Sequence, residues 1–389
     1  MAKTIGILTG GGDVPGLNPA MKAVVLSALD DGYRVLGIRR GWGGLLNYNL
    51  NEPATHDYYI RELSRWDVRT IDRTGGTFLH TSRTNPQKVK GDSIPDFLKN
   101  SKMGKKVGED GTMDYTDHVL SVLTHLGIEA LVPIGGDDTL SYAARIHKEG
   151  FPCVCIPKTM DNDVFGTDYC IGFSTAITRS VEFLTNMRTS VGSHERIGVV
   201  ELFGRNSGET SLFAAYLAYV DRAVIPEVEC DIAQLSEYLL EDKRNCPSNY
   251  AIMTISEGSI ISGMDVVETG EEDAYGHKKL GGVGMLVADE IKRRTGQNIM
   301  FQQPAYLMRS GAPDSLDRMV AMCYGNLAAQ LLKKGDTGKM VALQAGRYTA
   351  IPIDHIMTGK KTVEVEKYYD SKQYRPYVKD IIGIPMFLE

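Results

Sequence analysis

The sequence predicts an α/β fold, in which mainly parallel β-sheets are covered by helices on both faces. Two observations lead to this class. Short apolar segments alternate with segments of helical pattern along most of the 389 residues, which is typical of βαβ units. Glycine- and acid-rich turns follow several apolar segments, and open α/β sheets bind ligands where such strands end. The length predicts two or three structural units with a sizeable core.

The first unit is expected to start with a strand at 4–9, a glycine turn, a helix at 19–30 and a strand at 34–38. Asn18 is expected to cap this helix and Pro19 to be its first residue. The glycines of the turn allow a phosphate to approach the backbone, and a helix N-terminus favours anions. The unit continues with helices at 117–126 and 140–148 and strands at 128–134 and 153–156.

A second α/β unit follows the same alternation. Polar stretches at 84–115 and 259–278 are interpreted as loops, the first being an excursion over the site or an insertion. The tail from Asp354 is not assigned. The predicted helices cover 174–190, 209–219, 280–293 and 315–333, and the predicted strands cover 196–202, 250–255, 303–307, 340–344 and 348–352.

The composition limits the partners of the chain. The net charge is −6 at pH 7, with 42% hydrophobic and 24% charged residues, so nothing favours nucleic acid as a partner. No apolar run approaches the ~18 residues of a membrane span, and the first residues lead into a strand rather than a signal peptide. The six cysteines lack a paired metal-binding spacing, which indicates a reduced, cytoplasmic protein.

Two short runs carry the strongest chemical signal. Residues 135–139 (GGDDT) and 157–163 (PKTMDND) each follow a predicted strand, so they are expected to meet at one edge of a sheet. Carboxylates this close repel unless a cation holds them, and Mg²⁺ with a polyphosphate supplies one. The pattern predicts phosphoryl transfer, and a pair of surface turns is the alternative. The runs bring together four carboxylates and a lysine: Asp137, Asp138, Asp161, Asp163 and Lys158.

A dinucleotide-binding oxidoreductase is another alternative, and two features disfavour it. The fingerprint G-x-G-x-x-G, started at Gly10, requires glycine at position 15, which is Pro15. The second strand is followed by Arg39 and Arg40 rather than by the acidic residue that binds a ribose.

Several motifs occur in a specific order along roughly residues 3–347: ILTGGGDVPGLN, GGTFLHTSR, IGGDDT, PKTMDND, SHERIGVVELFGRNSG, TISEG and AYLMRSG. Through them the chain resembles the phosphofructokinase family. The resemblance implies two doubly wound parallel-sheet lobes with the active site between them, a homodimer or homotetramer with shared active sites, and Mg²⁺ as cofactor. It also implies phosphoryl transfer to the 1-hydroxyl of fructose 6-phosphate.

The resemblance also divides the chain. The expected parts are a donor-binding lobe at 1–171 with an insertion near 85–115, a sugar-phosphate lobe at 172–307, and a C-terminal segment at 308–389 that packs back on both lobes.

Roles of single residues follow from the same resemblance. Asp161 would accept the proton of the sugar hydroxyl, and Lys158 and Asp138 are grouped with it as catalytic residues. Asp137 would hold Mg²⁺ with help from Asp163. Arg196 would reach the sugar phosphate of a neighbouring subunit. The donor would be bound by Gly11, Gly12, Arg83 and Gly136. The sugar phosphate would be held by Thr159, Met160, Phe203, Gly204, Arg205, Glu257, Tyr306 and Arg309.

The predicted donor is pyrophosphate, with an ATP-dependent enzyme as the alternative. Family members that use ATP commonly carry glycine at the position of Asp138, where glycine leaves room for the α-phosphate. A carboxylate fills that space, and two unit charges at ~4 Å repel by about 4 kcal/mol at an effective dielectric of ~20. Lys158 supplies a cation near the leaving phosphate. A non-catalytic sugar-phosphate sensor is disfavoured, because it would need no base such as Asp161 beside a metal ligand.

Two positions depart from the family pattern. Met300 stands where an arginine often contacts phosphate, so either Arg293 or Arg294 replaces it or the chain is shifted locally. Members with a nucleotide effector use two basic residues of the first helix. Lys22 and Leu26 stand there, and the loss of one charge disfavours that effector site.

Overall fold

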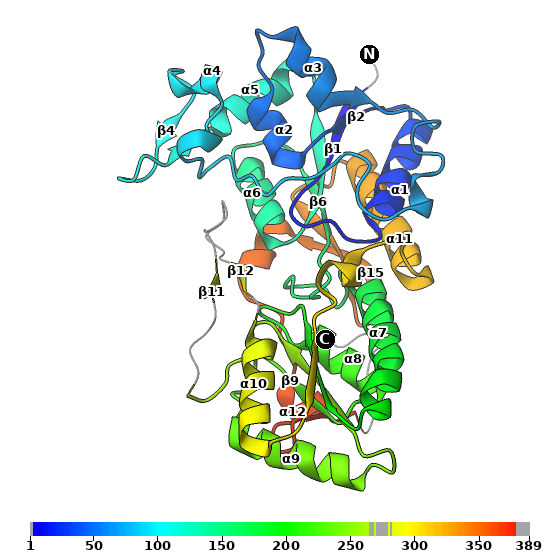
Figure 1. Ribbon diagram of the computed structural model, residues 1–389. Coiled ribbons are helices and arrows are strands. Elements are labelled where there is room, and N and C mark those ends of the chain that lie inside the picture. Colours follow the sequence, from blue (N-terminus) through cyan, green and yellow to red (C-terminus); the bar gives the residue numbers. More distant parts are fainter. Residues whose placement is uncertain (1–2, 264–267, 270–278, 281, 379–389) are drawn as a thin grey trace.

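The molecule consists of two α/β lobes that lie one above the other in Figure 1. The computed structural model describes residues 3–263, 268–269, 279–280 and 282–378. The first lobe is built on a seven-stranded sheet and the second on a four-stranded sheet, as far as the described residues show. The α/β class with two lobes is therefore confirmed.

The sheet of the first lobe has the order β15-β14-β7-β6-β1-β2-β3. Neighbouring strands run parallel except at the two edges, where β3 pairs antiparallel with β2 and β15 pairs antiparallel with β14. The strands are β1 (Thr4–Thr9), β2 (Arg34–Ile38), β3 (Ile60–Glu62), β6 (Ala130–Gly135), β7 (Val154–Pro157), β14 (Lys339–Gln344) and β15 (Arg347–Pro352).

Helices cover both faces of this sheet. Successive residues of β1 alternate between the faces, so that Ile7 belongs to one apolar cluster and Leu8 to another. The first cluster includes residues of α1 and α11, and the second includes residues of α2, α5 and α6. The helices of this lobe are α1 (Leu17–Asp30), α2 (Gly41–Asn47), α3 (Pro53–Tyr59), α5 (Thr116–His125), α6 (Asp137–Lys148) and α11 (Ser315–Lys334).

The sheet of the second lobe is parallel throughout, with the order β13-β8-β10-β9. Helix α7 packs against α8, and α9 packs against α10. The elements are β8 (Ile197–Leu202), β9 (Arg222–Val224), β10 (Ala251–Ser256), β13 (Ile299–Gln302), α7 (Phe173–Ser193), α8 (Glu209–Ala218), α9 (Ile232–Asn245) and α10 (Val283–Thr295).

Short elements complete the chain. The stretch 84–115 carries α4, β4 and β5, projects from the first lobe in Figure 1, and packs Val89, Leu98 and Tyr115 on Leu46 of α2. The predicted loop at 259–278 lies largely outside the described residues. The short elements are η1 (Ile71–Arg73), η2 (Gly91–Ser93), α4 (Asp96–Lys99), β4 (Lys105–Lys106), β5 (Met113–Asp114), β11 (Glu268–Thr269), β12 (Lys279–Leu280), η3 (Ala305–Arg309), η4 (Ile353–Met357), α12 (Val365–Tyr368), β16 (Tyr369–Asp370) and β17 (Arg375–Pro376).

The predicted start of the first helix is wrong. Helix α1 begins at Leu17, and its N-cap position is Gly16, whose φ of 109° suits glycine. Asn18 is buried instead of capping the helix. Its amide oxygen accepts a hydrogen bond from the Phe78 backbone N–H at 2.7 Å, and its amide nitrogen donates to the Thr74 carbonyl oxygen at 3.3 Å. Asn18 therefore fixes the 74–78 loop against the helix.

The predicted strand at 303–307 is also wrong. Strand β13 ends at Gln302, and the chain turns through Pro304 into the 3₁₀ helix η3. Proline has no N–H for a sheet hydrogen bond, so it ends the strand. Strand β9 and helix α9 were not expected at all. Among the described residues, no helix combines the length and the apolar character needed to span a membrane.

Candidate active site

A pocket of about 390 Å³ lies between the two lobes. Both predicted runs line it, together with the glycine turn after β1 and residues that follow β8 and β10 of the second lobe. The lining residues are Gly11, Gly12, Val14, Arg83, Gly136, Asp137, Asp138, Thr139, Lys158, Thr159, Met160, Asp161, Asp163, Phe203, Arg205, Asn206, Glu257, Arg309 and Lys360.

The loop after β7 carries Lys158 and Asp161 into this pocket. The Lys158 ammonium donates a hydrogen bond to the Gly12 carbonyl oxygen at 2.7 Å, which ties the loop to the turn after β1. The Asp161 backbone N–H donates to the Thr159 hydroxyl at 3.2 Å. Asn162 adopts a positive φ of 55°, a conformation that asparagine tolerates better than most residues. The loop therefore turns sharply between Asp161 and Asp163.

A buried network holds this turn in place. The Asn162 amide nitrogen donates to a Glu209 carboxylate oxygen at 2.7 Å and to the Asp168 carbonyl oxygen at 2.9 Å. Lys361 forms an ion pair with Glu209 at 3.2 Å and donates to the Asp168 carbonyl oxygen at 2.8 Å. Both members of the ion pair are buried. The C-terminal segment thus stabilises the loop that carries Asp161.

The second run lies at the start of helix α6. The N-cap position is Gly136, without a side-chain cap, and Asp137 and Asp138 occupy the first turn. Carboxylates are stabilised there by the helix dipole. Asp138 is not at the cap position, because α6 starts one residue before it, and Asp138 lines the pocket.

Close packing explains the glycines of the turn after β1. Gly11 has a φ of +78°, and a side chain at Gly12 would meet a guanidinium nitrogen of Arg309 at 2.5 Å. The Gly11 N–H already donates to the Ser82 carbonyl oxygen at 3.0 Å, and the Thr81 hydroxyl donates to the Gly11 carbonyl oxygen at 2.7 Å. Gly11 therefore fits a donor by allowing close approach rather than by offering its N–H.

Burial raises the pKa of the acids in the pocket. It brings the pKa of Asp137 to about 7, with the charge of Asp163 as the next cause. The pKa of Glu257 also rises to about 7 by burial. For Asp161, burial raises the pKa well above its usual range, and the charges of Asp163 and Glu257 add to the shift. This cluster therefore needs positive charge to keep its carboxylates ionised.

Lys158 shows the opposite shift. Burial, followed by the charges of the nearby guanidinium groups of Arg309 and Arg83, lowers its pKa to about 8. The lysine is 4% exposed. Three cationic groups thus share one side of the pocket, and a bound polyanion would offset their repulsion.

The acids fit a magnesium ion that is shared with phosphate. One carboxylate oxygen each of Asp137 and Asp161 is buried without a hydrogen-bond partner among the described residues. Within the same residues, no group of three or more His, Cys, Asp or Glu side chains is arranged to hold a metal by itself. Mg²⁺ needs no such cage, because it binds one or two carboxylates, water and substrate phosphates. Asp137 and Asp163 can supply those carboxylates.

Arg309 lines the pocket next to two aromatic rings. The Arg309 guanidinium lies 4.6 Å from the centre of the Tyr306 ring and 5.9 Å from that of Phe203. Its Nε is buried without a partner among the described residues, although Asp13 lies 3.7 Å from the group. Gly204 has a φ of +141°, and a side chain there would meet the Ser207 carbonyl oxygen at 2.7 Å. This glycine lets the chain turn between two lining residues.

Three predicted residues do not line the pocket. Gly204 lies between Phe203 and Arg205, which do line it. Tyr306 touches the pocket only through Arg309, and its side chain is 62% exposed. Arg196 precedes β8 and so lies at the opposite end of the strand from Phe203, about 20 Å away at ~3.3 Å per residue.

The arginine expected to replace Met300 is not found here. Arg293 and Arg294 are both paired with Glu290 at the end of α10, at 2.6 Å and 2.7 Å, and neither lines the pocket. Met300 packs against the core of the second lobe.

Sequence reasoning missed four lining residues: Val14, Thr139, Asn206 and Lys360. Thr139 and Asn206 belong to motifs that the sequence analysis had singled out. They could have been predicted because each lies next to a predicted site residue. Lys360 gave no such signal, because it belongs to the unassigned C-terminal tail. Its amino group brings a further cation to the acids, and its charge lowers the pKa of Asp137.

Known proteins are similar to this chain in sequence and in fold. Residues 4–332 match the family described as Phosphofructokinase. The chain is 35% identical over 373 residues to the pyrophosphate–fructose 6-phosphate 1-phosphotransferase of Amycolatopsis methanolica, covering 95% of this chain and 99% of that protein. It is 33% identical over 372 residues to the ATP-dependent 6-phosphofructokinase of Corynebacterium efficiens, covering 94% and 97%.

Structural comparison agrees with the sequence comparison. The crystal structure of a pyrophosphate-dependent phosphofructokinase from Marinobacter aquaeolei has the same fold, with a TM-score of 0.75 at 16% identity, over 98% of this chain and 90% of that one. On the family match and the identities above, the chain belongs to the phosphofructokinase family.

Proposed function

We propose that this protein transfers a phosphoryl group from pyrophosphate to the 1-hydroxyl of fructose 6-phosphate, reversibly and with Mg²⁺. The observation that carries the proposal is the pocket between the lobes, where buried carboxylates face cationic side chains from both lobes. Phosphoryl transfer needs positioning and charge stabilisation more than covalent help from the protein. Relatives at about this identity that are named pyrophosphate–fructose 6-phosphate 1-phosphotransferase support the same reaction.

Asp161 acts as the base in this proposal. One of its oxygens is buried and has no partner among the described residues, so it is available to accept the proton of the sugar hydroxyl. The positive charges of Lys158 and Arg205 favour its ionised form. Mg²⁺ held by Asp137 and Asp163 would add positive charge beside the pyrophosphate.

The remaining residues position the two substrates. Arg83, Lys158 and the backbone at Gly11, Gly12 and Gly136 bind the pyrophosphate. The sugar phosphate is bound by Arg205 and Arg309, and Glu257 accepts hydrogen bonds from sugar hydroxyls. Thr159, Met160, Phe203, Gly204 and Tyr306 complete the sugar site.

Asp138 selects the donor. Its place in the first turn of α6, on the wall of the pocket, supports a role in which its negative charge repels the part of a nucleotide that continues beyond the β- and γ-phosphates. Pyrophosphate ends before this wall and is tolerated, whereas ATP is repelled. An ATP-dependent enzyme remains the second candidate, because a relative named so matches nearly the whole chain.

A coupled assay with fructose 6-phosphate and each donor tests this proposal. The wild type should use pyrophosphate, run in reverse with phosphate, and use ATP poorly, whereas Asp138→Gly should gain affinity for ATP. Asp117→Gly is the matched control, since Asp117 lies at the same position of α5 and is exposed and paired with Lys105 at 2.9 Å. A wild type that strongly prefers ATP at equal concentration would overturn the donor assignment.

The wider setting is part of the same proposal. We place the enzyme in the cytoplasm, because its six cysteines are all free. We also propose a homodimer or homotetramer, because the family resemblance implies active sites that are shared between subunits. The division into 1–171, 172–307 and 308–389 is supported by the return of the last segment: β14 and β15 join the first sheet, whereas Tyr368 and Tyr374 belong to the core of the second lobe.

A further inference from the structure

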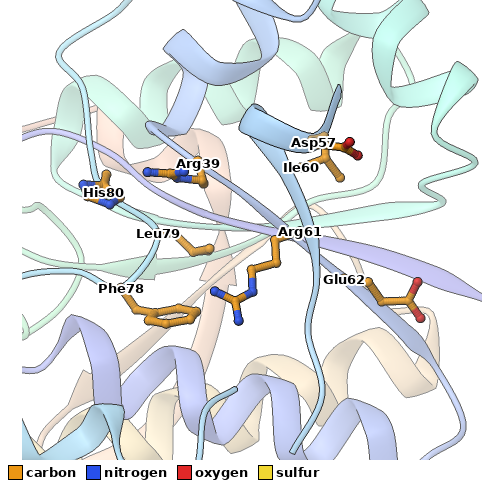
Figure 2. Close-up of a pocket in the computed structure, with 8 residues that line it drawn as sticks. All are labelled: Arg39, Asp57, Ile60, Arg61, Glu62, Phe78, Leu79 and His80. Atoms are coloured by element: carbon orange, nitrogen blue, oxygen red, sulfur yellow. The ribbon is translucent and has the colours of Figure 1, made fainter. Parts of the chain in front are cut away.

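A second pocket of about 670 Å³ lies beside β3, at the edge of the first sheet. We call it the β3 pocket. None of its lining residues lines the active site. Figure 2 shows these residues, which are Arg39, Asp57, Ile60, Arg61, Glu62, Phe78, Leu79 and His80.

Two arginines and a histidine of the β3 pocket face a common space. In Figure 2 the guanidinium groups of Arg39 and Arg61 and the imidazole of His80 lie on one side of β3, around Phe78 and Leu79. The carboxylates of Asp57 and Glu62 lie on the other side of the strand in this view. Glu62 is bound there by Arg34, at 2.7 Å. The side with the arginines therefore carries the positive charge of Arg39, whereas the charge of Arg61 is balanced by Asp67.

The arginines are held in place by aromatic rings. The Arg39 guanidinium lies 4.7 Å from the centre of the Tyr58 ring, and that of Arg61 lies 5.1 Å from the centre of the Phe78 ring. Arg61 is also paired with Asp67. Arg39 forms no ion pair with any residue in the described ranges. Stacked guanidinium groups keep their N–H donors in a fixed plane, which suits a phosphate or a carboxylate.

The segment that lines the β3 pocket continues into the active site. The His80 carbonyl oxygen accepts a hydrogen bond from the Thr9 hydroxyl at 3.0 Å. The next two residues, Thr81 and Ser82, hold the backbone of Gly11, and Arg83 then lines the active site. His80 and Arg83 are three residues apart, which is about 10 Å of extended chain, so one short segment joins the two pockets.

We propose that the β3 pocket binds a small organic phosphate and that its occupancy changes the affinity of the active site for the phosphoryl donor. The phosphate is bound by Arg39 and His80, with Arg61 at the opposite wall. The pocket differs from the effector position that other family members have on the first helix, because Lys22 of that helix is paired with Asp72 at 2.7 Å and does not line the β3 pocket.

Binding is tested first, without reference to catalysis. Titration calorimetry on the full chain uses 3-phosphoglycerate, glycerol 3-phosphate and glycerate as probes. The first two should bind and glycerate should not, because the phosphate is the recognised group. Measurements in saturating fructose 6-phosphate keep the probes from the sugar site. Absence of binding by both phosphorylated probes would overturn the proposal.

Variants then locate the site. Arg39→Ala with His80→Asn should weaken probe binding about ten-fold or more, and asparagine is chosen because His80 has a φ of 57°. Arg145→Ala is the control, since it removes an arginine that is paired with Glu149 and does not line the pocket, and it should leave binding unchanged. If the double variant does not fold, Arg39→Gln alone serves the same test. Equal binding by wild type and folded variants would contradict this location.

Coupling is the last arm, and it alone rests on the proposed function. In the assay of pyrophosphate use, the bound probe should change KM for pyrophosphate by about five-fold, while kcat stays constant. The change should vanish in the double variant. Binding without any change of KM would refute the coupling but leave both the binding site and the proposed reaction standing, whereas absence of turnover would refute the proposed function alone.

Discussion

Asp161 is the residue on which the proposed chemistry depends most. It follows Thr159 in a loop whose backbone is fixed by Lys158 and Asn162, so its carboxylate is positioned by its neighbours in the chain. Its pKa is raised by burial, and nearby cations oppose this shift. Because the carboxylate touches no described partner through its buried oxygen, its removal should affect the reaction more than the fold.

Asp161→Ser is therefore expected to lower turnover by about 10²–10⁴-fold, the usual contribution of a general base. Affinity for fructose 6-phosphate should stay nearly unchanged, because Arg205, Glu257 and Arg309 keep their places. Steady-state kinetics with a circular dichroism control measures both quantities. Near-normal turnover in a folded variant would remove Asp161 from the role of base.

Lys158 makes the donor site sensitive to pH. Its pKa of about 8 means that the ammonium is charged below pH 8 and loses its proton above it. We expect kcat/KM for pyrophosphate to fall as the pH rises through about 8, by up to ten-fold per pH unit, because this ratio reports ionisations of the free enzyme. In Lys158→Arg, which stays charged, the fall should be absent. A flat wild-type profile from pH 7 to 10 would contradict this role.

At the scale of elements, the C-terminal segment stabilises a loop that lies some 200 residues earlier in the chain. The ion pair of Lys361 and Glu209 is buried, and Glu209 also accepts a hydrogen bond from Asn162. Burial raises the pKa of Glu209, while Lys361 opposes the rise. Loss of the lysine would leave the buried Glu209 carboxylate with the hydrogen bond from Asn162 but without a positive charge beside it.

Lys361→Met should destabilise the protein by about 3–5 kcal/mol, the usual cost of breaking a buried ion pair from one side. Turnover should fall as well, because Asn162 separates Asp161 from Asp163. Lys367→Met is the control: Lys367 is exposed and paired with Glu364 at 2.8 Å, and exposed pairs contribute about 0–1 kcal/mol.

The double variant Lys361→Met, Glu209→Gln shows how much of the lost stability is due to the unpaired charge of Glu209 and how much to altered packing. It should recover part of the lost stability, because no unpaired carboxylate stays buried. Denaturant unfolding measures the free energy of unfolding of the wild type, the two single variants and the double variant. Equal stability of wild type and Lys361→Met would show that this ion pair does not hold the loop.

At the scale of the whole molecule, the candidate active site lies between the two lobes. Residues that are far apart in the chain, from Gly11 to Lys360, line it together. Arg196 is one of the three predicted residues that do not line the pocket, and it lies at the far end of β8. This position agrees with a role toward a neighbouring subunit, which stays a prediction.

Mixed oligomers test that role. Arg196→Ala and Asp161→Ser should each be inactive as pure proteins, and mixing their subunits should restore part of the activity through sites that combine one intact residue from each. Size-exclusion chromatography with light scattering gives the oligomeric state. A fully active monomer at assay concentration would exclude a shared site.

The sequence alone predicted most of the larger strands and helices of the two lobes and the meeting of the two acidic runs at one pocket. These features are local: apolar spacing fixes strands and helices, and a turn after a strand fixes where its side chains emerge. The prediction of a strand at 303–307 was wrong because Pro304 interrupts the apolar pattern. The prediction that Asn18 caps the first helix was wrong because Gly16 occupies the N-cap position with the required backbone conformation.

Only the tertiary structure decided which distant segments meet. Lys360 and Lys361 reach the loop of Asp161 because β14 pairs with β7 and returns the tail to the cleft. The β3 pocket forms because β3 pairs with β2 at the edge of the sheet, next to the loop that carries His80. Local pattern cannot specify such contacts, because they depend on the order of strands in a sheet, which is set by packing across the whole lobe.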